Sequence, residues 1–209
     1  AIFSGIAITL IVYGGKNVLT MVGIAAGLWL VLTALLDPVR QISGRGPQFS
    51  RAALGMSIAH MGLGLFVLGV TVTTSFNVET DQRIAVGETA RIGDYSIRFN
   101  GGELIVTQAG RPIATLHPEK RVYGARSSPM TEAGIDAGWS RDVFIALGDD
   151  LGRDAWSVRL QYKPLIRFIW LGALVMAFGG VIAASDRRYR LPVRVSVPVV
   201  SPGSQPAQP

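Results

Sequence analysis

One histidine, His60, lies inside an apolar segment that contains no other ionisable residue. The chain has no charged side chain between Leu54 and Thr74, and an ionisable group within a membrane segment is a candidate functional site because it is costly to place there. Three roles fit an imidazole at this position: an axial bond to haem iron, a polar contact with a neighbouring helix, or a proton relay. Gly64 follows one helical turn later and has no side chain, so a flat ligand bound to His60 would find room against the backbone there. The spacing alone leaves the three roles open.

The polar part of the sequence holds no set of residues typical of catalysis, and we assign no catalytic residue. The chain has no cysteine, which excludes disulfides, zinc–thiolate sites and thiolate chemistry. Two groups of charged residues can be interpreted as carboxylate pairs for acid–base work, as ion pairs that fix loops on a β scaffold, or as a surface for a partner protein. They are Glu119, Lys120 and Arg121 in the first group, and Glu132 and Asp136 in the second.

Four apolar segments are expected to enter or cross a membrane as helices. They comprise residues 1–13, 18–36, 54–75 and 165–184. The last three have the ~20 residues that a helix needs to cross ~30 Å of hydrocarbon, and glycines within them are typical of close helix packing. The first is about half a span long. We expect it to be the second half of a helix whose beginning is missing, so that the chain is a fragment or one product of a split gene.

Basic residues predict which side of the membrane each connection faces. The net charge of +6 comes mainly from arginines in the loop 37–53 and in the tail 185–209, whereas the polar stretch 76–164 is nearly neutral. The positive-inside rule places that loop and that tail in the cytoplasm, and the Pro-, Ser- and Gln-rich tail is expected to be partly disordered. We therefore expect a protein of the bacterial inner (plasma) membrane whose polar domain lies in the periplasm, and no nucleic-acid binding.

The stretch 76–164 is expected to form an inserted all-β domain. Short runs such as ARIGDYSIRFNG, RDVFIALG and AWSVRLQY alternate apolar and polar residues and are separated by Gly, Asn and Asp turns. About seven to nine such strands fit a small sandwich or barrel. Residues 127–140 are less regular, and we expect them to form a loop across the sheet. The predicted fold class is a membrane α-helical bundle of about four spans plus this inserted β domain.

Several motifs resemble one family, and they occur in the same order as in its members. They are AHMGLGLFVLGV, PEKRVY, MTEAGIDAGWSRDVFIALGD, WSVRLQYKPLIRFIWLGALVMAFGG and DRRYR. The sequence resembles the C-terminal part of CcmF, of the CcmF/CycK/CcsA family. The resemblance covers nearly the whole chain except the proline-rich tail.

The resemblance implies a function that composition and spacing do not. Members of this family are haem lyase components of bacterial cytochrome c maturation, which help to attach haem to the CxxCH motif of apocytochrome c. They hold haem b within the membrane between two histidines. His60, in the matching AHMG, corresponds to one of them, so His60 is expected to bind the iron, with Gly64 beside the cofactor. The implied partners are the haem chaperone CcmE, the proteins CcmH and CcmI, and apocytochrome c, with quinol as a candidate electron donor.

The chain departs from the family pattern in one large respect. It lacks the tryptophan-rich WWD segment, the histidines that flank it and the second haem b histidine. The second axial ligand is therefore expected from outside this chain, from the N-terminal part of CcmF, and the chain alone is expected to be inactive. Two alternatives stay open: a non-catalytic membrane-anchored assembly platform with a β docking domain, and one half of a transporter.

Overall fold

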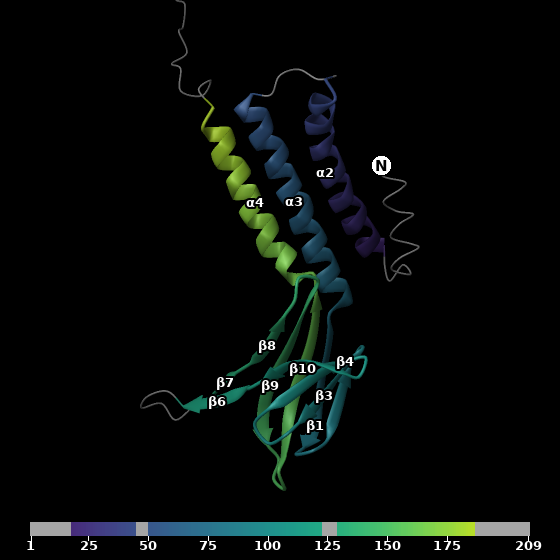
Figure 1. The fold of residues 1–209 in the computed structure, drawn as a ribbon, viewed down its shortest axis with the longest axis vertical. Coiled ribbons are helices and arrows are strands. Elements are labelled where there is room, and N and C mark those ends of the chain that lie inside the picture. The colour runs from purple at the N-terminus through teal and green to yellow at the C-terminus, as the bar shows by residue number, and fades with distance from the viewer. Residues whose placement is uncertain (1–17, 45–49, 123–128, 187–209) are drawn as a thin grey trace, which may run out of the picture.

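Three long helices stand at one end of the molecule and a β domain at the other (Figure 1). The computed structural model describes residues 18–44, 50–122 and 129–186. The helices are α2 (Val18–Ile42), α3 (Arg51–Phe76) and α4 (Ile166–Ala184), and each is long and apolar enough to cross a membrane. The expected partial span 1–13 lies outside the described residues.

The helices begin and end at different residues from those expected. The helix α2 continues past Leu36 to Ile42 with Pro38 inside it, because polar residues at a helix end can leave the hydrocarbon without ending the helix. The helix α3 begins at Arg51 because Ser50 caps it: the Ser50 hydroxyl accepts a hydrogen bond of 3.1 Å from the Ala53 N–H. Both helices thus take residues from the expected connection 37–53.

Glycines bring α3 and α4 into backbone contact. Glycines recur every seven residues on α3, and those of α4 face them in antiparallel order. A Cβ at Gly62 would lie 2.5 Å from the Met176 nitrogen, and one at Gly172 would lie 2.5 Å from the Phe66 nitrogen. Small residues at such crossings let helices in lipid approach closely. We call this set the glycine seam: Gly55, Gly62 and Gly69 of α3, with Gly172 and Gly179 of α4.

The β domain is a sandwich of antiparallel sheets. One sheet has the order β1-β10-β9-β8, the second has the order β2-β3-β4-β5, and β6 and β7 form a separate two-stranded ribbon. The strands are β1 (Val78–Ala85), β2 (Thr89–Ile92), β3 (Tyr95–Phe99), β4 (Leu104–Gln108), β5 (Arg111–Leu116), β6 (Glu119–Val122), β7 (Pro129–Glu132), β8 (Gly134–Ala137), β9 (Arg141–Asp150) and β10 (Ala155–Pro164).

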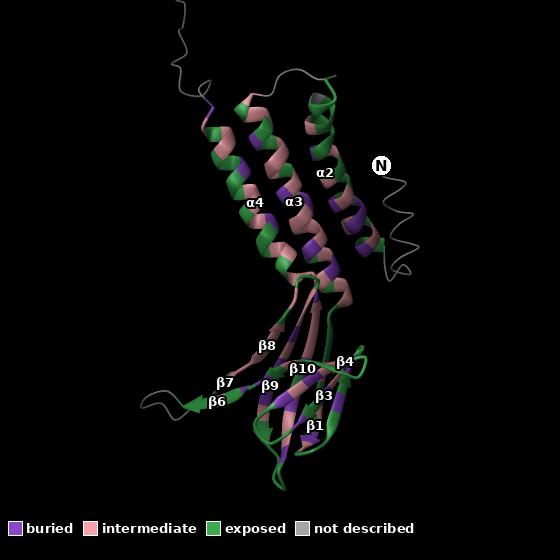
Figure 2. Cartoon of the chain, in the orientation of Figure 1, coloured by how far each residue is buried: buried purple, intermediate pink, exposed green. Residues whose placement is uncertain are grey.

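Alternating side chains of the two four-stranded sheets meet in one core. Ile97, Leu104 and Val106 from one sheet, and Ile145 and Leu160 from the other, are completely buried. Figure 2 shows buried positions interspersed with intermediate and exposed ones along these strands. The predicted fold class, membrane helices with an inserted β domain, is confirmed, and the domain is a sandwich rather than a barrel.

The segment 127–140 differs from its expected loop structure. Its described residues form β7 and β8. The strand β8 pairs with β9 over four residues, from Gly134 opposite Ile145 to Ala137 opposite Asp142. A strand this short, which lies at the edge of a sheet, begins with Gly134 and is followed by Gly138, carries too few alternating residues to be recognised from its pattern.

The sandwich is joined to the helices at several points. The strand β1 follows α3 directly, and β10 leads into α4 through Leu165. The Thr73 hydroxyl of α3 donates to the Pro164 carbonyl at 2.7 Å. The Leu165 N–H donates to the Ser140 carbonyl at 2.9 Å. These contacts fix one end of the β1-β10-β9-β8 sheet against the end of α3 and the start of α4.

Candidate functional site

His60 lies on α3 with its side chain exposed. Its Nδ1 is 2.8 Å from the Met56 carbonyl oxygen, one turn earlier in the same helix. A carbonyl can only accept, so Nδ1 carries the proton and, in the neutral ring, Nε2 keeps its lone pair. A metal-binding histidine commonly donates its other N–H to a carbonyl in this way, which fixes both tautomer and ring orientation. His60 is therefore prepared to act as an acceptor or a ligand through Nε2.

His60 belongs to a row of side chains on α3 that are exposed in the described part of the chain, apart from the half-buried Val67. Successive members are four, three, four, three and four residues apart, which is the spacing of a helix face that packs against another helix. Met56 is 56% exposed and Leu63 is 37% exposed. The Thr74 hydroxyl bonds the Val70 carbonyl of its own helix at 2.7 Å, so it is satisfied within the helix. We call this row the open stripe: Met56, His60, Leu63, Val67, Val70 and Thr74.

Gly64 packs against the helix α2, whereas the sequence suggested that it would leave room for a flat ligand. It is buried against α2, where an added Cβ would lie 2.7 Å from the Val31 side chain and 2.9 Å from the Gly27 carbonyl oxygen. The absence of a side chain at Gly64 is thus used for packing of α3 on α2. We therefore do not assign Gly64 to a cofactor site, since α2 fills the room that the sequence left there.

Within the described residues His60 is a single donor and not part of a metal-binding group. No set of three or more His, Asp and Glu side chains comes together there. His117, the second histidine, is exposed on the sandwich after β5. A single imidazole suits an axial position on a cofactor that brings its own equatorial ligands, as haem does, and does not suit a site built entirely from protein.

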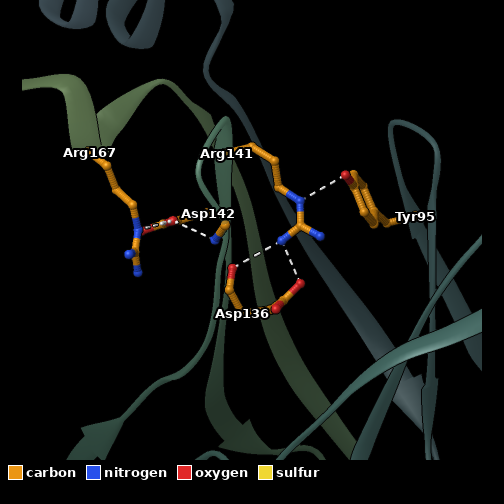
Figure 3. Close-up of polar contacts among 6 residues, drawn as sticks. Tyr95, Asp136, Arg141, Asp142 and Arg167 are labelled. Atoms are coloured by element: carbon orange, nitrogen blue, oxygen red, sulfur yellow. Dashed lines mark hydrogen bonds and ion pairs between the residues drawn. The ribbon is translucent and has the colours of Figure 1, made fainter.

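A second polar cluster lies where the sandwich meets the helices (Figure 3). The Arg141 Nε donates to the Tyr95 hydroxyl at 2.8 Å, and its guanidinium carbon lies 4.8 Å from the centre of the Tyr95 ring. The Arg141 Nη1 donates to the Asp136 carboxylate and, at 3.1 Å, to the Asp136 carbonyl. Asp142 accepts from the Gly138 N–H and from Arg167 Nε of α4, each at 3.2 Å.

This cluster has the electrostatics of a structural joint. Burial of Arg141 disfavours its charge, but the hydrogen bonds that Arg141 donates to Asp136 and Tyr95 outweigh burial and raise the pKa of Arg141. For Tyr162, whose charged form is the deprotonated one, burial raises the pKa, with a smaller contribution from Tyr95. Both groups therefore keep their protons at neutral pH, and neither is suited to proton transfer. Asp136, a candidate carboxylate from the sequence, is committed to an ion pair.

The remaining candidate charges also form ion pairs. Arg121 joins β6 to β7, with nitrogen–oxygen distances of 2.9 Å to Glu119 and 3.2 Å to Glu132. Lys120 pairs with Asp149 of β9 at 2.9 Å. Sequence reasoning missed Tyr95 and Arg167, because their partners are far away along the chain. An arginine just inside a membrane helix, which suggests a nearby carboxylate, was the only available signal.

Comparison with known proteins agrees with the architecture. The family described as the CcmF C-terminal beta-sandwich matches residues 75–164. The "Cytochrome c-type biogenesis protein CcmF" of Pseudomonas fluorescens is 39% identical over 94% of this chain and 32% of its own length. That of Escherichia coli (strain K12) is 38% identical over 82% of this chain and 28% of its own length.

A solved structure shares the fold. The chain described as "Cytochrome c Heme Lyase CcmF" superposes with a TM-score of 0.65 at 17% identity, over 88% of this chain and 34% of that chain. The chain thus spans about a third of the length of the relatives that it matches. Taken with the apolar helices on either side of the sandwich, these matches show that the chain belongs to the CcmF family and corresponds to its C-terminal part.

Proposed function

We propose that this chain is the C-terminal module of a cytochrome c haem lyase, in which His60 gives one axial ligand to haem b within the membrane. The observation that carries the proposal is the His60 ring: Nδ1 is bonded to the Met56 carbonyl, and the side chain is exposed on the open stripe. The relatives, named as cytochrome c-type biogenesis proteins, support the process. The module would assist covalent attachment of haem to apocytochrome c.

The residues around His60 fit a haem edge. Haem supplies an iron that can change its oxidation state, and its porphyrin needs an apolar, water-free surface. Leu63 and Val67 of the open stripe offer such a surface next to the imidazole. The bond to Met56 holds the ring orientation and leaves the Nε2 lone pair available for a bond to iron. The fit concerns His60 and the open stripe, not Gly64.

The second axial ligand would come from outside this chain. Within the described residues the open stripe has no covering helix, and its alternating spacing of four and three is that of a helix–helix seam. The matched relatives are about three times longer than this chain. A helix from their N-terminal part, packed on the open stripe, would bring the second ligand opposite His60 and exclude water from the site.

The other partners follow from the proposed role. The protein would lie in the bacterial inner membrane with the sandwich in the periplasm, where it would offer a docking surface near the site at which haem meets apocytochrome c. CcmE would deliver the haem, CcmH and CcmI would present apocytochrome c, and quinol is the candidate electron donor. The runner-up is a non-catalytic assembly platform, in which the His60–Met56 bond only satisfies a polar side chain.

The visible spectrum of the assembled protein tests the proposal. We would co-express the chain with the N-terminal part of CcmF, purify the complex and record oxidised and reduced spectra. The His60→Ala variant should lose the six-coordinate b-type spectrum. The matched control is His117→Ala, which removes the exposed histidine of the sandwich and should leave the spectrum unchanged. A wild-type spectrum in His60→Ala would remove the ligand role and favour the assembly platform.

A further inference from the structure

Trp139 is the most exposed large hydrophobic side chain of the described sandwich. It is 82% exposed, in the turn between β8 and β9. The turn itself is well held: the Gly138 N–H donates to the Arg141 carbonyl at 2.8 Å and to the Asp142 carboxylate at 3.2 Å. An indole held in the open by a rigid turn is unfavourable in water, because its large apolar ring stays hydrated.

The turn that carries Trp139 is bonded to the first residues of α4. The Ser140 carbonyl accepts from the Leu165 N–H at 2.9 Å, and Asp142 pairs with Arg167 at 3.2 Å. Figure 1 shows the β8–β9 turn at the end of the sandwich closest to the helices. The depth of Trp139 is therefore set by the position at which α4 enters the membrane.

The length of α4 places that position. The helix has 19 residues. At ~1.5 Å per residue its length is about 28 Å, slightly less than the ~30 Å thickness of the hydrocarbon. All of α4 is thus needed to span, and the hydrocarbon must begin close to Ile166. The neighbouring end of α3 agrees, since Thr73, Thr74 and Ser75 bring hydroxyl groups to the same level. We therefore expect the β8–β9 turn, which carries Trp139, close to the boundary between water and lipid.

The helix α4 presents an exposed apolar row that is suited to contact with lipid. Trp170 is 73% exposed, and an exposed apolar row continues along the helix. Arg167, one turn before Trp170, is about half-exposed and reaches back to Asp142 outside the hydrocarbon, as basic side chains do at membrane ends. The row is Trp170, Leu174, Phe178 and Val181. The turn that carries Trp139 is thus bonded to the start of a helix whose exposed face is apolar and includes a second tryptophan, Trp170.

We propose that the Trp139 turn is a membrane-contact site of the sandwich, with the indole inserted among the lipid headgroups and the first acyl carbons on the sandwich side of the bilayer. Tryptophan prefers this depth, because its ring is apolar while its N–H can still bond water or lipid carbonyls. The contact would add a third point of attachment to the two helix connections and limit rocking of the sandwich on the membrane. It does not depend on the haem proposal.

Fluorescence quenching in nanodiscs tests the contact. The chain has four tryptophans, so the variant Trp29→Phe, Trp156→Phe and Trp170→Phe leaves Trp139 as the sole indole. Lipids brominated at shallow acyl carbons should quench its emission about twofold more than deeply brominated lipids, and aqueous iodide should quench it weakly. The matched control keeps only Trp156, at the far end of the ten-residue strand β10, which brominated lipids should not quench.

Two outcomes would overturn the proposal. Strong quenching by iodide with none by brominated lipid would show that the indole stays in water. Protection from both quenchers would show that protein covers Trp139. Far-UV circular dichroism of the single-tryptophan variants confirms that each is folded before quenching is compared.

Discussion

The glycine seam makes a sharp prediction about what holds the membrane part together. Gly62→Ala adds one methyl group to α3 at a place where its two nearest neighbours are backbone atoms: the Met176 nitrogen at 2.5 Å and the Gly172 carbonyl oxygen at 2.7 Å. An ordinary van der Waals contact is about 3.4–4 Å. The two helices must therefore separate by roughly 1 Å, which weakens every other contact along the seam.

The expected cost combines two opposing effects. Overpacking of a close-packed contact costs about 1–3 kcal/mol, while replacing glycine by alanine within a helix returns up to ~1 kcal/mol. Because the clash is with backbone, we expect a net destabilisation of about 1–2 kcal/mol. Gly180→Ala is the matched control: it is the same change in the same helix pair, and within the described residues the added Cβ would meet no neighbour outside its own helix backbone within 4 Å. That control should be neutral or slightly stabilising.

Unfolding by sodium dodecyl sulfate in mixed micelles, followed by far-UV circular dichroism at 222 nm, measures the difference. Gly62→Ala should unfold at a lower detergent fraction than wild type, and Gly180→Ala should not. If Gly62→Ala and Gly180→Ala unfold together, backbone contact along the glycine seam is not what holds α3 to α4.

Three further predictions concern the polar contacts. Asp186→Asn replaces the carboxylate that accepts from the Ala52 N–H at 2.9 Å, and should cost about 0.5–1 kcal/mol in the same detergent titration, since the charge favours the α3 N-terminus. Arg141→Gln should destabilise the sandwich by about 1–3 kcal/mol, measured by urea unfolding, because Asp136 loses its ion-pair partner. The pKa of Tyr162 is raised above 10.0 chiefly by burial, so the unfolded chain loses this proton first and stability should fall as pH rises above about 10. Tyr162→Phe should make that alkaline loss shallower in urea titrations at stepped pH.

The membrane spans and the β class were predictable because both depend on local patterns. About twenty uncharged residues such as those around His60 must form a helix in lipid. Alternation of apolar and polar residues in a run such as that of β9 indicates a half-buried strand. The alternation predicts that every second residue of β9 is buried. Val143, Ile145 and Leu147 are all buried. The edge strand β8 escaped prediction because an edge position relaxes the alternation that would identify it.

The site was only partly predictable for a geometric reason. A sequence gives the angle of each residue around a helix, so it predicts that His60 and Gly64 lie near one face. It does not say which neighbour each meets. Gly64 lies against α2 while His60 is exposed, because about 40° of rotation separates residues four apart on a helix. The Arg141 cluster depends on partners as far as 46 residues away, and no local pattern encodes such a contact.

The arrangement of the helices explains how the position of His60 is fixed relative to the sandwich. The middle helix, α3, packs against α4 through the glycine seam and against α2 through Gly64, so its rotation about its own axis is set on two sides. Its last turn is bonded to Pro164 at the end of β10, and its chain continues directly into β1 of the same sheet. A change in tilt of the sandwich must therefore strain the α3–α4 pair or move α3 with it. The sandwich and the helix that carries His60 are therefore linked at the end of α3, both through Pro164 and through the chain that leads into β1.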